Sequence, residues 1–400
     1  MAFRERSAVE ERIAMFLDWD TGAYSATALA ARYGISRETF YVWKRRRESC
    51  DATWYEEYSR SPIICPHATS DTARGAIVAM RRRFPQFGPK KIRAKLGADQ
   101  PQLIWPAAST IGDILKTEGL VANKPRRRRP IAQGEIVSGA STPNGEWAID
   151  FKGWFRTRDG ERCDPLTITD TASRYLIATK IVEPTWMGVR CALERVFSDV
   201  GLPDAMRSDN GAPFGSTGAG GLSSLSVWWL RLGIEPRYIP PSSPQDNGRH
   251  ERMHRTLKAE TTRPAAHSAN EQQARFDTFR TYYNDERPHE ALDQTPPAQH
   301  WQPSARPFKR GQLDDPWYDA DHQVRSVRRQ GTIKWRGEFV FIGEALAGEL
   351  IGVAELENGH HIVRFCGRDL GVIDREHRFH RFAPPRARLR STMETDMGTE

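Results

Sequence analysis

Residues 245–258 read QDNGRHERMHRTLK, and this segment constrains the architecture more than any other part of the chain. It follows a proline-rich loop and has the pattern of a basic helix that carries one carboxylate, Glu251. Two acids upstream have informative settings: Asp150 ends the apolar run WAID (147–150), and Asp209 stands in the turn-forming SDNG (208–211). A strand, a strand end and a helix can bring three such side chains to one point at the edge of a sheet.

Three carboxylates that converge repel one another and require cations. Hard divalent ions suit them, because such ions prefer oxygen ligands and keep positions open for water and phosphate. Two ions about 3.5–4 Å apart can stabilise both the attacking and the leaving oxygen of a phosphodiester. The three acids therefore suggest a divalent-metal site that acts on phosphodiesters.

Each acid also has a structural explanation. A single aspartate before a turn most often caps that turn. Asp170, in the segment DTAS (170–173), is a rival to Asp150, although its setting is that of a strand end and a turn. Asp246 is better explained as the N-terminal cap of the helix that follows it.

The composition favours an acidic partner. The chain has 400 residues, enough for three or four domains, and its 59 Lys and Arg against 51 Asp and Glu give a net charge of +8. The positive charge falls in three blocks, at residues 44–47, 81–83 and 124–129. Net charge alone fits an ordinary basic enzyme equally well, and such blocks are often only solvated. Their position beside candidate DNA-binding elements favours nucleic acid.

Cysteine usage and hydropathy indicate the compartment. The five cysteines include no Cys-x-x-Cys pair, which argues for a reducing environment without a disulfide framework. No His/Cys set has convincing zinc spacing. No apolar stretch approaches the length of a membrane span, and the charged N-terminus lacks a signal-peptide core. We expect a soluble cytoplasmic protein, associated with the nucleoid and without a membrane partner.

Residues 1–50 are predicted to form a helix-turn-helix DNA-binding domain. Helices are expected over 9–19, 28–33 and 37–47, and Phe40 and Trp43 can face the interior. The third helix offers its polar residues to a DNA groove: Arg37, Thr39, Tyr41, Lys44 and Arg45. An ordinary helical hairpin is the alternative, but the charge falls on the recognition helix.

A linker over 51–69 is expected to lead to a second helix-turn-helix-like domain over 70–123. Its helices are predicted at 72–84, 90–96 and 110–117, with Pro89 at the start of the second. A basic linker over 124–144 follows. Its predicted DNA-binding residues are Lys124, Arg126, Arg127, Arg128 and Arg129.

Residues 145–302 change to an alternating pattern that predicts a mixed sheet in an α/β domain. Strands are expected over 146–155, 163–169, 175–182, 204–208 and 234–239, and helices over 185–200, 222–232, 245–261 and 270–302. A linker over 303–321 and a small all-β, SH3-like barrel over 322–384 follow, with a hairpin at Asn358-Gly359. The tail 385–400 is expected to be mobile.

Several of these segments together resemble one known family. Residues 145–300 look like the RNase H-like integrase core of Asp-Asp-Glu transposases, and most closely like bacterial insertion-sequence transposases of the retroviral-integrase type. The matching stretches are WAIDFKG (147–153), DTASRY (170–175), SDNGAPF (208–214), residues 245–258, and YNDERPH (283–289). The resemblance implies that Asp150, Asp209 and Glu251 are the catalytic residues and the ligands of Mg²⁺ or Mn²⁺, with two ions bound.

The predicted helix adds two candidate contacts for DNA. Arg255 and Lys258 lie four and seven residues after Glu251, hence on the same face of the helix, where they can hold terminal phosphates; His254 is also close. The sequence departs from the family in one place. The stretch between Asp209 and Glu251 is longer than in compact members, and residues 215–221, GSTGAGG, read as an insertion in a mobile loop.

The resemblance implies a DNA transposase that binds the terminal repeats of a mobile element. It would free 3′-hydroxyl ends by hydrolysis and join them to target DNA by metal-dependent transesterification, as a homo-oligomer on DNA. An accessory ATPase stays open as a further partner. Two alternatives stay open as well: a catalytically inactive DNA-binding regulator derived from a transposase, and an RNase H-like nuclease without strand transfer.

Overall fold

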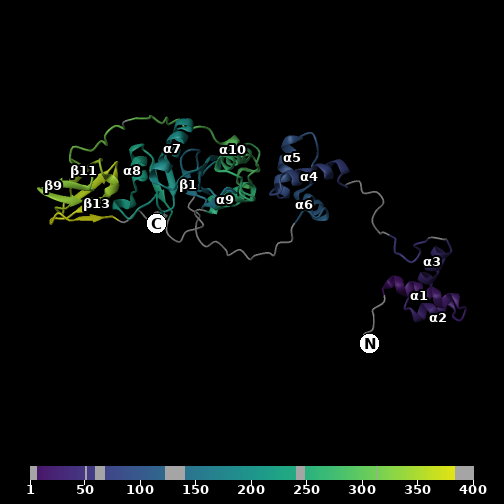
Figure 1. The fold of residues 1–400 in the computed structure, drawn as a ribbon. Helices are drawn as coiled ribbons and strands as arrows, with labels where there is room; N and C mark the ends of the chain where they lie inside the picture. Colours follow the sequence, from purple (N-terminus) through teal and green to yellow (C-terminus); the bar gives the residue numbers. More distant parts are fainter. Residues whose placement is uncertain are drawn as a thin grey trace, which may run out of the picture. The chain divides into compact units, whose positions relative to one another are not determined.

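The structure, a computed structural model, describes residues 7–49, 52–58, 68–121, 140–239, 248–311 and 313–382. Figure 1 shows the course of the chain. The chain divides into two compact units, Met1–Thr69 and Ser70–Glu400, and each is described by itself. Several predicted features lie outside the described residues: Asp246 and the first turn of its helix, the basic block 124–129, and the tail 385–400.

Three helices form the first unit, close to their predicted bounds. They are α1 (Ala8–Asp20), α2 (Ala26–Arg32) and α3 (Arg37–Glu48). A serine before each helix accepts a hydrogen bond from the backbone N–H three residues later, which satisfies a donor that the helix leaves free. Phe40 is fully buried against Phe16, and Trp43 is half-buried beside them, as predicted.

A second set of three helices begins the second unit. They are α4 (Asp71–Arg83), α5 (Pro89–Asp99) and α6 (Ala108–Thr117). Pro89 occupies the first turn of α5, as expected, and α5 continues past its predicted end at residue 96. The core between them encloses Ile77, Phe87 and Ile111.

A five-stranded mixed sheet forms the centre of the second unit, in the order β5-β4-β1-β6-β7. Its strands are β1 (Trp147–Phe151), β4 (Pro165–Asp170), β5 (Leu176–Ile181), β6 (Ala205–Ser208) and β7 (Glu235–Tyr238). Strands β1, β4 and β5 pair antiparallel, whereas β1, β6 and β7 pair parallel. The predicted mixed sheet with the Asp150 strand at its centre is confirmed.

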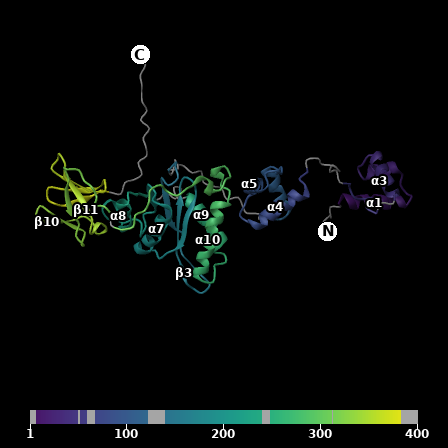
Figure 2. The same cartoon turned by 90° about the horizontal axis from the view of Figure 1, so that it is seen from above.

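Helices cover both faces of this sheet (Figure 2). The helices are α7 (Trp186–Val200), α8 (Ser224–Arg231), α9 (Gly248–Thr261) and α10 (Ala269–Asp285). Trp147 and Ile149 pack into the core that α7 and α8 close. Side chains alternate along a strand, so Asp150 points to the opposite face, which α9 and α10 cover. Met253 and Phe276 belong to the core on that face.

Two predicted boundaries are wrong. The strand expected over 146–155 ends at Phe151, because the chain turns at Gly153 (φ 83°) and forms a separate hairpin of β2 (Phe155–Arg156) and β3 (Arg162–Cys163). The helix expected over 270–302 ends at Asp285, since Pro288 restricts the residue before it and cannot continue a helix. Two short 3₁₀ helices, η3 (Glu290–Leu292) and η4 (Pro297–His300), follow.

From residue 322 to residue 382 the described chain is built of β-strands, as predicted, with one short 3₁₀ helix, η5 (Glu344–Leu346); we call residues 323–381 the β-domain. Its strands are β8 (Gln323–Ser326), β9 (Thr332–Trp335), β10 (Glu338–Phe341), β11 (Leu350–Glu355), β12 (His361–Phe365), β13 (Arg368–Ile373) and β14 (Phe379–Arg381). They form a five-stranded sheet and a two-stranded sheet. The predicted hairpin at Asn358-Gly359 joins β11 to β12.

The expected mobile loop at residues 215–221 is instead packed. It contains a short 3₁₀ helix, η1 (Ala219–Gly221), and Ala219 is buried in one core with Leu370 of the β-domain. Gly220 has a φ of 61°, and a Cβ added there would be in contact with Leu370 Cδ2, at 3.4 Å. The insertion therefore joins the sheet domain to the β-domain.

Candidate active site

Strands β1 and β6 place two of the predicted ligands side by side. Trp147 lies opposite Met206 and Ala148 opposite Arg207 in this parallel pair. The same register, continued past the end of β6, brings Asp150 opposite Asp209. Asp150 is half-buried and Asp209 is exposed. The two acids thus emerge from neighbouring strands at one edge of the sheet, where their carboxyl ends meet.

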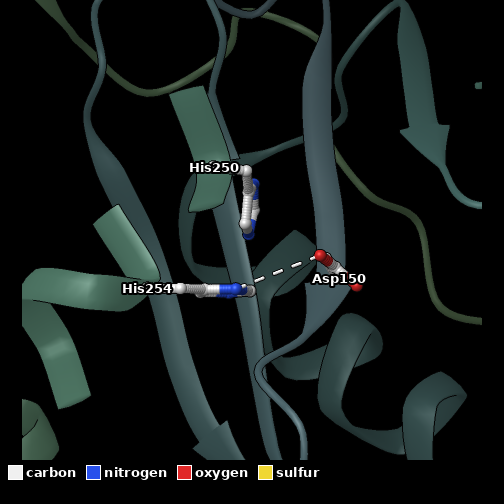
Figure 3. A group of neighbouring side chains, drawn as sticks. All are labelled: Asp150, His250 and His254. Atoms are coloured by element: carbon white, nitrogen blue, oxygen red, sulfur yellow. Dashed lines mark ion pairs between the residues drawn. The ribbon is translucent and has the colours of Figure 1, made fainter. Parts of the chain in front are cut away.

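Two histidines of α9 pack on the sheet beside Asp150 (Figure 3). The Nε2 atoms of His250 and His254 lie 2.7 and 2.6 Å from Thr167 Oγ1. Thr167 is the β4 partner of Asp150, and its hydroxyl donates to the Asp150 carbonyl oxygen at 3.0 Å. His254 Nδ1 faces Asp150 Oδ2 at 4.0 Å. One ligand atom from each of Asp150, His250 and His254 lies within 4.8 Å of the others.

Burial keeps both imidazoles uncharged. It lowers the pKa of His250 to about 3, with a smaller effect from Arg207. It lowers the pKa of His254 to about 2, with further effects from His250 and Lys152. Both side chains are therefore neutral at physiological pH, and the positive charge near the carboxylates comes from lysine and arginine.

Glu251 opens onto a basic cleft of about 450 Å³ next to the strand edge. The cleft is lined by Lys152, Glu251, His254, Arg255, Lys258, Ala259 and Arg263. The predicted common face of Glu251, Arg255 and Lys258 on the helix is thus present. Among the described residues that line the cleft, neither Asp150 nor Asp209 is found. The cleft holds four cationic side chains and one carboxylate, a balance that attracts phosphate.

Lys152 links the cleft to the strand edge, two residues after Asp150. Burial and the nearby Lys258 ammonium lower the pKa of Lys152, and Asp150 partly opposes them. Crowded cations of this kind lose repulsion when an anion binds between them. The arrangement is therefore suited to a polyanion.

The turn after β6 holds Asp209 in place. Asp209 Oδ1 accepts a hydrogen bond from the Gly211 N–H at 3.1 Å, and Asn210 Nδ2 donates to the Ile239 carbonyl at 2.8 Å. Phe214 is buried and packs against Trp229 of α8. Asp209 thus stabilises its own turn and still presents an exposed carboxylate.

Asp170, the rival to Asp150, has a structural role. It is 1% exposed, and it accepts hydrogen bonds from the Asn144 N–H at 2.8 Å and from both the N–H and the hydroxyl of Ser173, at 2.7 and 2.6 Å. A carboxylate with these partners fixes the turn between β4 and β5 and is closed to a ligand.

The predicted DNA contacts of the first unit are unequally available. Arg37, Tyr41 and Arg45 are exposed and four residues apart on α3, so they share one face. Thr39 is half-buried and its hydroxyl bonds with that of Ser36, at the helix cap. Lys44 pairs with Glu48 at 3.6 Å.

In the second unit, Arg255 and Lys258 are exposed. Lys124 and Arg126–Arg129 lie outside the described residues.

Sequence patterns do not identify four residues of this site: Lys152, Thr167, His250 and Arg263. One signal was available, since His250 and His254 are four residues apart and must share a helix face. Thr167 gives no local signal, because its role comes from two histidines that lie 83 and 87 residues later in the sequence.

None of the helices in the described part of the chain combines the length and the apolar composition that a membrane crossing requires.

Sequence comparisons bear on the domain that holds this site. Two profiles of the integrase core domain family match residues 140–244 and 232–297. An uncharacterized 39.2 kDa protein of insertion element IS476 from Xanthomonas euvesicatoria is 24% identical over 251 residues, which cover 61% of this chain and 68% of that protein. An uncharacterized 31.7 kDa protein of insertion element IS407 from Burkholderia multivorans is 26% identical, over 46% of this chain and 66% of that protein.

Retroviral proteins are similar as well. The Gag-Pol polyprotein of baboon endogenous virus is 26% identical over 47% of this chain, which is 10% of that polyprotein. Among solved structures, a simian T-cell lymphotropic virus intasome in complex with PP2A regulatory subunit B56 gamma matches 67% of this chain and 91% of its own at 18% identity and a TM-score of 0.36. The HTLV-2 integrase catalytic core in complex with magnesium matches 40% and 97%, at 15% identity and 0.32.

Both TM-scores are low, so the assignment rests on the sequence matches. These span β1 to η4, the segment that carries all three predicted acids. Residues 140–297 therefore match the integrase core domain family, and the chain is similar to proteins of bacterial insertion elements.

Proposed function

We propose that the protein is a DNA transposase. It hydrolyses a phosphodiester at each end of its mobile element and joins the freed 3′-hydroxyls to target DNA by transesterification. The observation that carries this proposal is the parallel register of β1 and β6, which continues toward Asp150 and Asp209 at neighbouring strand ends, beside a basic cleft that contains Glu251.

The residues at the strand edge suit a divalent cation. Asp150, Asp209 and Glu251 supply the oxygen donors that Mg²⁺ and Mn²⁺ prefer, and the exposed positions of the last two leave room for substrate. One or two such ions, when bound, supply Lewis acidity toward the scissile phosphate. Asp170 is excluded as a ligand by its own hydrogen bonds.

The basic side chains of the cleft bind and orient the DNA end. Arg255 and Lys258 lie on the Glu251 face of α9, where each can neutralise a phosphate. Lys152, directly after β1, lines the same cleft. The backbone between these cations is held with its scissile bond toward the carboxylates. His250 and His254, both neutral and buried, exclude water from the sheet side.

The helical segments provide the sequence recognition in this proposal. Residues 1–50 read the terminal repeat through Arg37, Tyr41 and Arg45, and residues 70–123 act as a second DNA-binding domain. The basic block 124–129 adds salt-sensitive affinity for phosphates. Two element ends must be joined, so the chain acts as a homo-oligomer on DNA.

A strand-transfer assay tests the proposal. The full chain is incubated with DNA ends that flank its gene, a target plasmid and Mg²⁺ or Mn²⁺. Asp150→Asn, Asp209→Asn and Glu251→Gln should each abolish cleavage and joining and leave end binding intact in a gel-shift assay. Glu235→Gln, an exposed acid on β7, is the control and should remain active.

The outcomes separate the alternatives. Cleavage without joining would identify a nuclease, and specific binding without either reaction would identify a regulator. Full activity in a chelator would contradict the metal dependence. Robust joining by any one of the three variants would remove that residue from the active site.

A further inference from the structure

The hydrogen bonds around Thr167 determine the state of both histidines. A hydroxyl has one hydrogen to donate and two lone pairs that accept. Thr167 donates to the Asp150 carbonyl, so it accepts from the Nε2 of both His250 and His254. Each neutral imidazole therefore carries its hydrogen on Nε2 and a lone pair on Nδ1.

The two lone pairs meet different partners. Thr169 Oγ1 lies 3.2 Å from Nδ1 of His250 and can donate to it, so both ring nitrogens of His250 are satisfied. Nδ1 of His254 instead faces Asp150 Oδ2 at 4.0 Å (Figure 3). Two atoms that both present lone pairs repel each other unless a cation lies between them.

The spacing suits one ion. Nitrogen and carboxylate ligands lie about 2.0–2.2 Å from a transition-metal ion, so two ligands of the same ion can be up to about 4 Å apart. The competing arrangement is a protonated His254 that donates directly to Asp150. It would need a contact of about 2.7–3.2 Å, which is shorter than the 4.0 Å between His254 Nδ1 and Asp150 Oδ2.

We propose that Asp150 Oδ2 and His254 Nδ1 share one divalent ion, and that this centre prefers Mn²⁺, Co²⁺ or Zn²⁺, which accept nitrogen ligands, over Mg²⁺. His250 is a positioning residue: it holds Thr167 and Thr169, which fix the ring of His254. The inference rests on the proposed function in that Asp150 serves both, but the ligand set can be tested without DNA.

Nitrogen-15 NMR of the full chain labelled at histidine gives the first test. The His254 signals are identified by their loss in His254→Gln. Without metal, His254 should be in the Nε2–H tautomer. Addition of Zn²⁺ should shift its Nδ1 resonance and leave that of His267, an exposed histidine outside the site, in place. An Nδ1–H tautomer, or an Nδ1 that ignores zinc, would overturn the proposal.

Calorimetric titration with MnCl₂ and MgCl₂ gives the second test. His254→Gln is the informative variant, because its amide reaches the Nε2 position, keeps the bond to Thr167 and removes Nδ1. It should weaken Mn²⁺ binding by about tenfold or more and leave Mg²⁺ binding nearly unchanged. His267→Gln should change neither. Equal Mn²⁺ affinity in His254→Gln and the wild type would refute the shared ion.

The two proposals can fail separately. If strand transfer is absent from the wild type while His254→Gln weakens Mn²⁺ binding, the metal centre stands and the transposase proposal falls. If strand transfer requires the three acids but His254→Gln binds Mn²⁺ and joins DNA normally, the transposase proposal stands and the shared metal ion is refuted.

Discussion

The two aspartates that meet at the sheet edge are supported in different ways. Asp150 lies inside β1, which pairs on one side with β4 and on the other with β6, and α9 closes over it through two buried histidines. Asp209 follows the last residue of β6, and the segment after it runs into the core of the β-domain. Asp150 therefore depends on its own sheet and on the helix that covers it, whereas Asp209 depends on a second domain.

Several contacts connect the segment after Asp209 with the β-domain. Ala219 and Leu222 are buried in the β-domain core, and Arg381 of β14 donates to the carbonyl of Thr217. Further along, Arg231 of α8 pairs with Glu349 at 3.0 Å. Each of these contacts can be altered without touching Asp150, so variants can weaken one side of the site at a time.

The largest effect is expected on the Asp150 side, from Thr167→Val. It removes the acceptor for two buried N–H groups, and each unsatisfied group costs about 1–3 kcal/mol. The melting temperature should fall and strand transfer should drop by about 100-fold, since supporting residues of metal sites have effects of this size. Thr179→Val is a matched control, because the Thr179 hydroxyl is buried without a partner in the described structure. Equal melting temperatures and equal strand-transfer rates in the two variants would show that Thr167 does not support the site.

On the Asp209 side, Leu370→Ala should have the next largest effect. Truncation of a fully buried leucine costs about 2–5 kcal/mol, and Leu370 lies directly against Gly220. Hydrogen exchange should accelerate over residues 211–222 and stay unchanged over 147–151. Ile373→Ala weakens the same β-domain at a residue equally buried on β13 and serves as the control. If both variants leave residues 211–222 protected, the β-domain does not hold the Asp209 segment.

A pH-dependent effect is expected from Arg231→Met. Burial raises the pKa of Glu349, and Arg231 opposes that rise. A raised pKa in the folded state means that Glu349 contributes stability below its ordinary pKa and loses it as the pH rises through the folded value. Without Arg231 the pKa rises further, so the melting temperature of the variant should fall relative to wild type as the pH increases from 4.5 to 7. The double variant with Glu349→Gln should lose this dependence; if it keeps it, another group is responsible.

The smallest effect is expected from Lys258→Ala, which touches neither aspartate. An exposed charge contributes about 1 kcal/mol or less, and the other basic residues still hold the duplex. The variant should bind DNA almost normally and join it more slowly, with loss of crosslinking between position 258 and the terminal nucleotides. Arg252→Ala, exposed on the same helix but outside the cleft, is the control. No crosslink in the wild type and an unchanged rate would leave Lys258 as an ordinary surface charge.

The sequence predicts those parts of the site that local patterns encode. The apolar run before Asp150 places it on a central strand, SDNG places Asp209 in a turn, and helical spacing puts Arg255 and Lys258 on the face of Glu251. What it does not predict depends on distant partners. Thr167 acquires its role through the α9 histidines, 83 and 87 residues later. Residues 215–221 look flexible because their burial comes from the β-domain, more than a hundred residues later.

The contacts of α4–α6 with the sheet domain bear on the distance between the DNA bases that are recognised and the bond that is cleaved. Phe84 stacks on Tyr282 of α10 at 5.4 Å, and Arg287 lies over Phe87 while it donates to Glu260 of α9. The helices that would read DNA are thus fastened to the helix that carries Glu251. If residues 70–121 bind DNA, as predicted, the distance between the recognised bases and the cleaved bond is fixed by the protein. Each inserted base pair adds about 3.4 Å, so the cut should stay at a fixed distance from the recognised bases rather than follow a displaced element end.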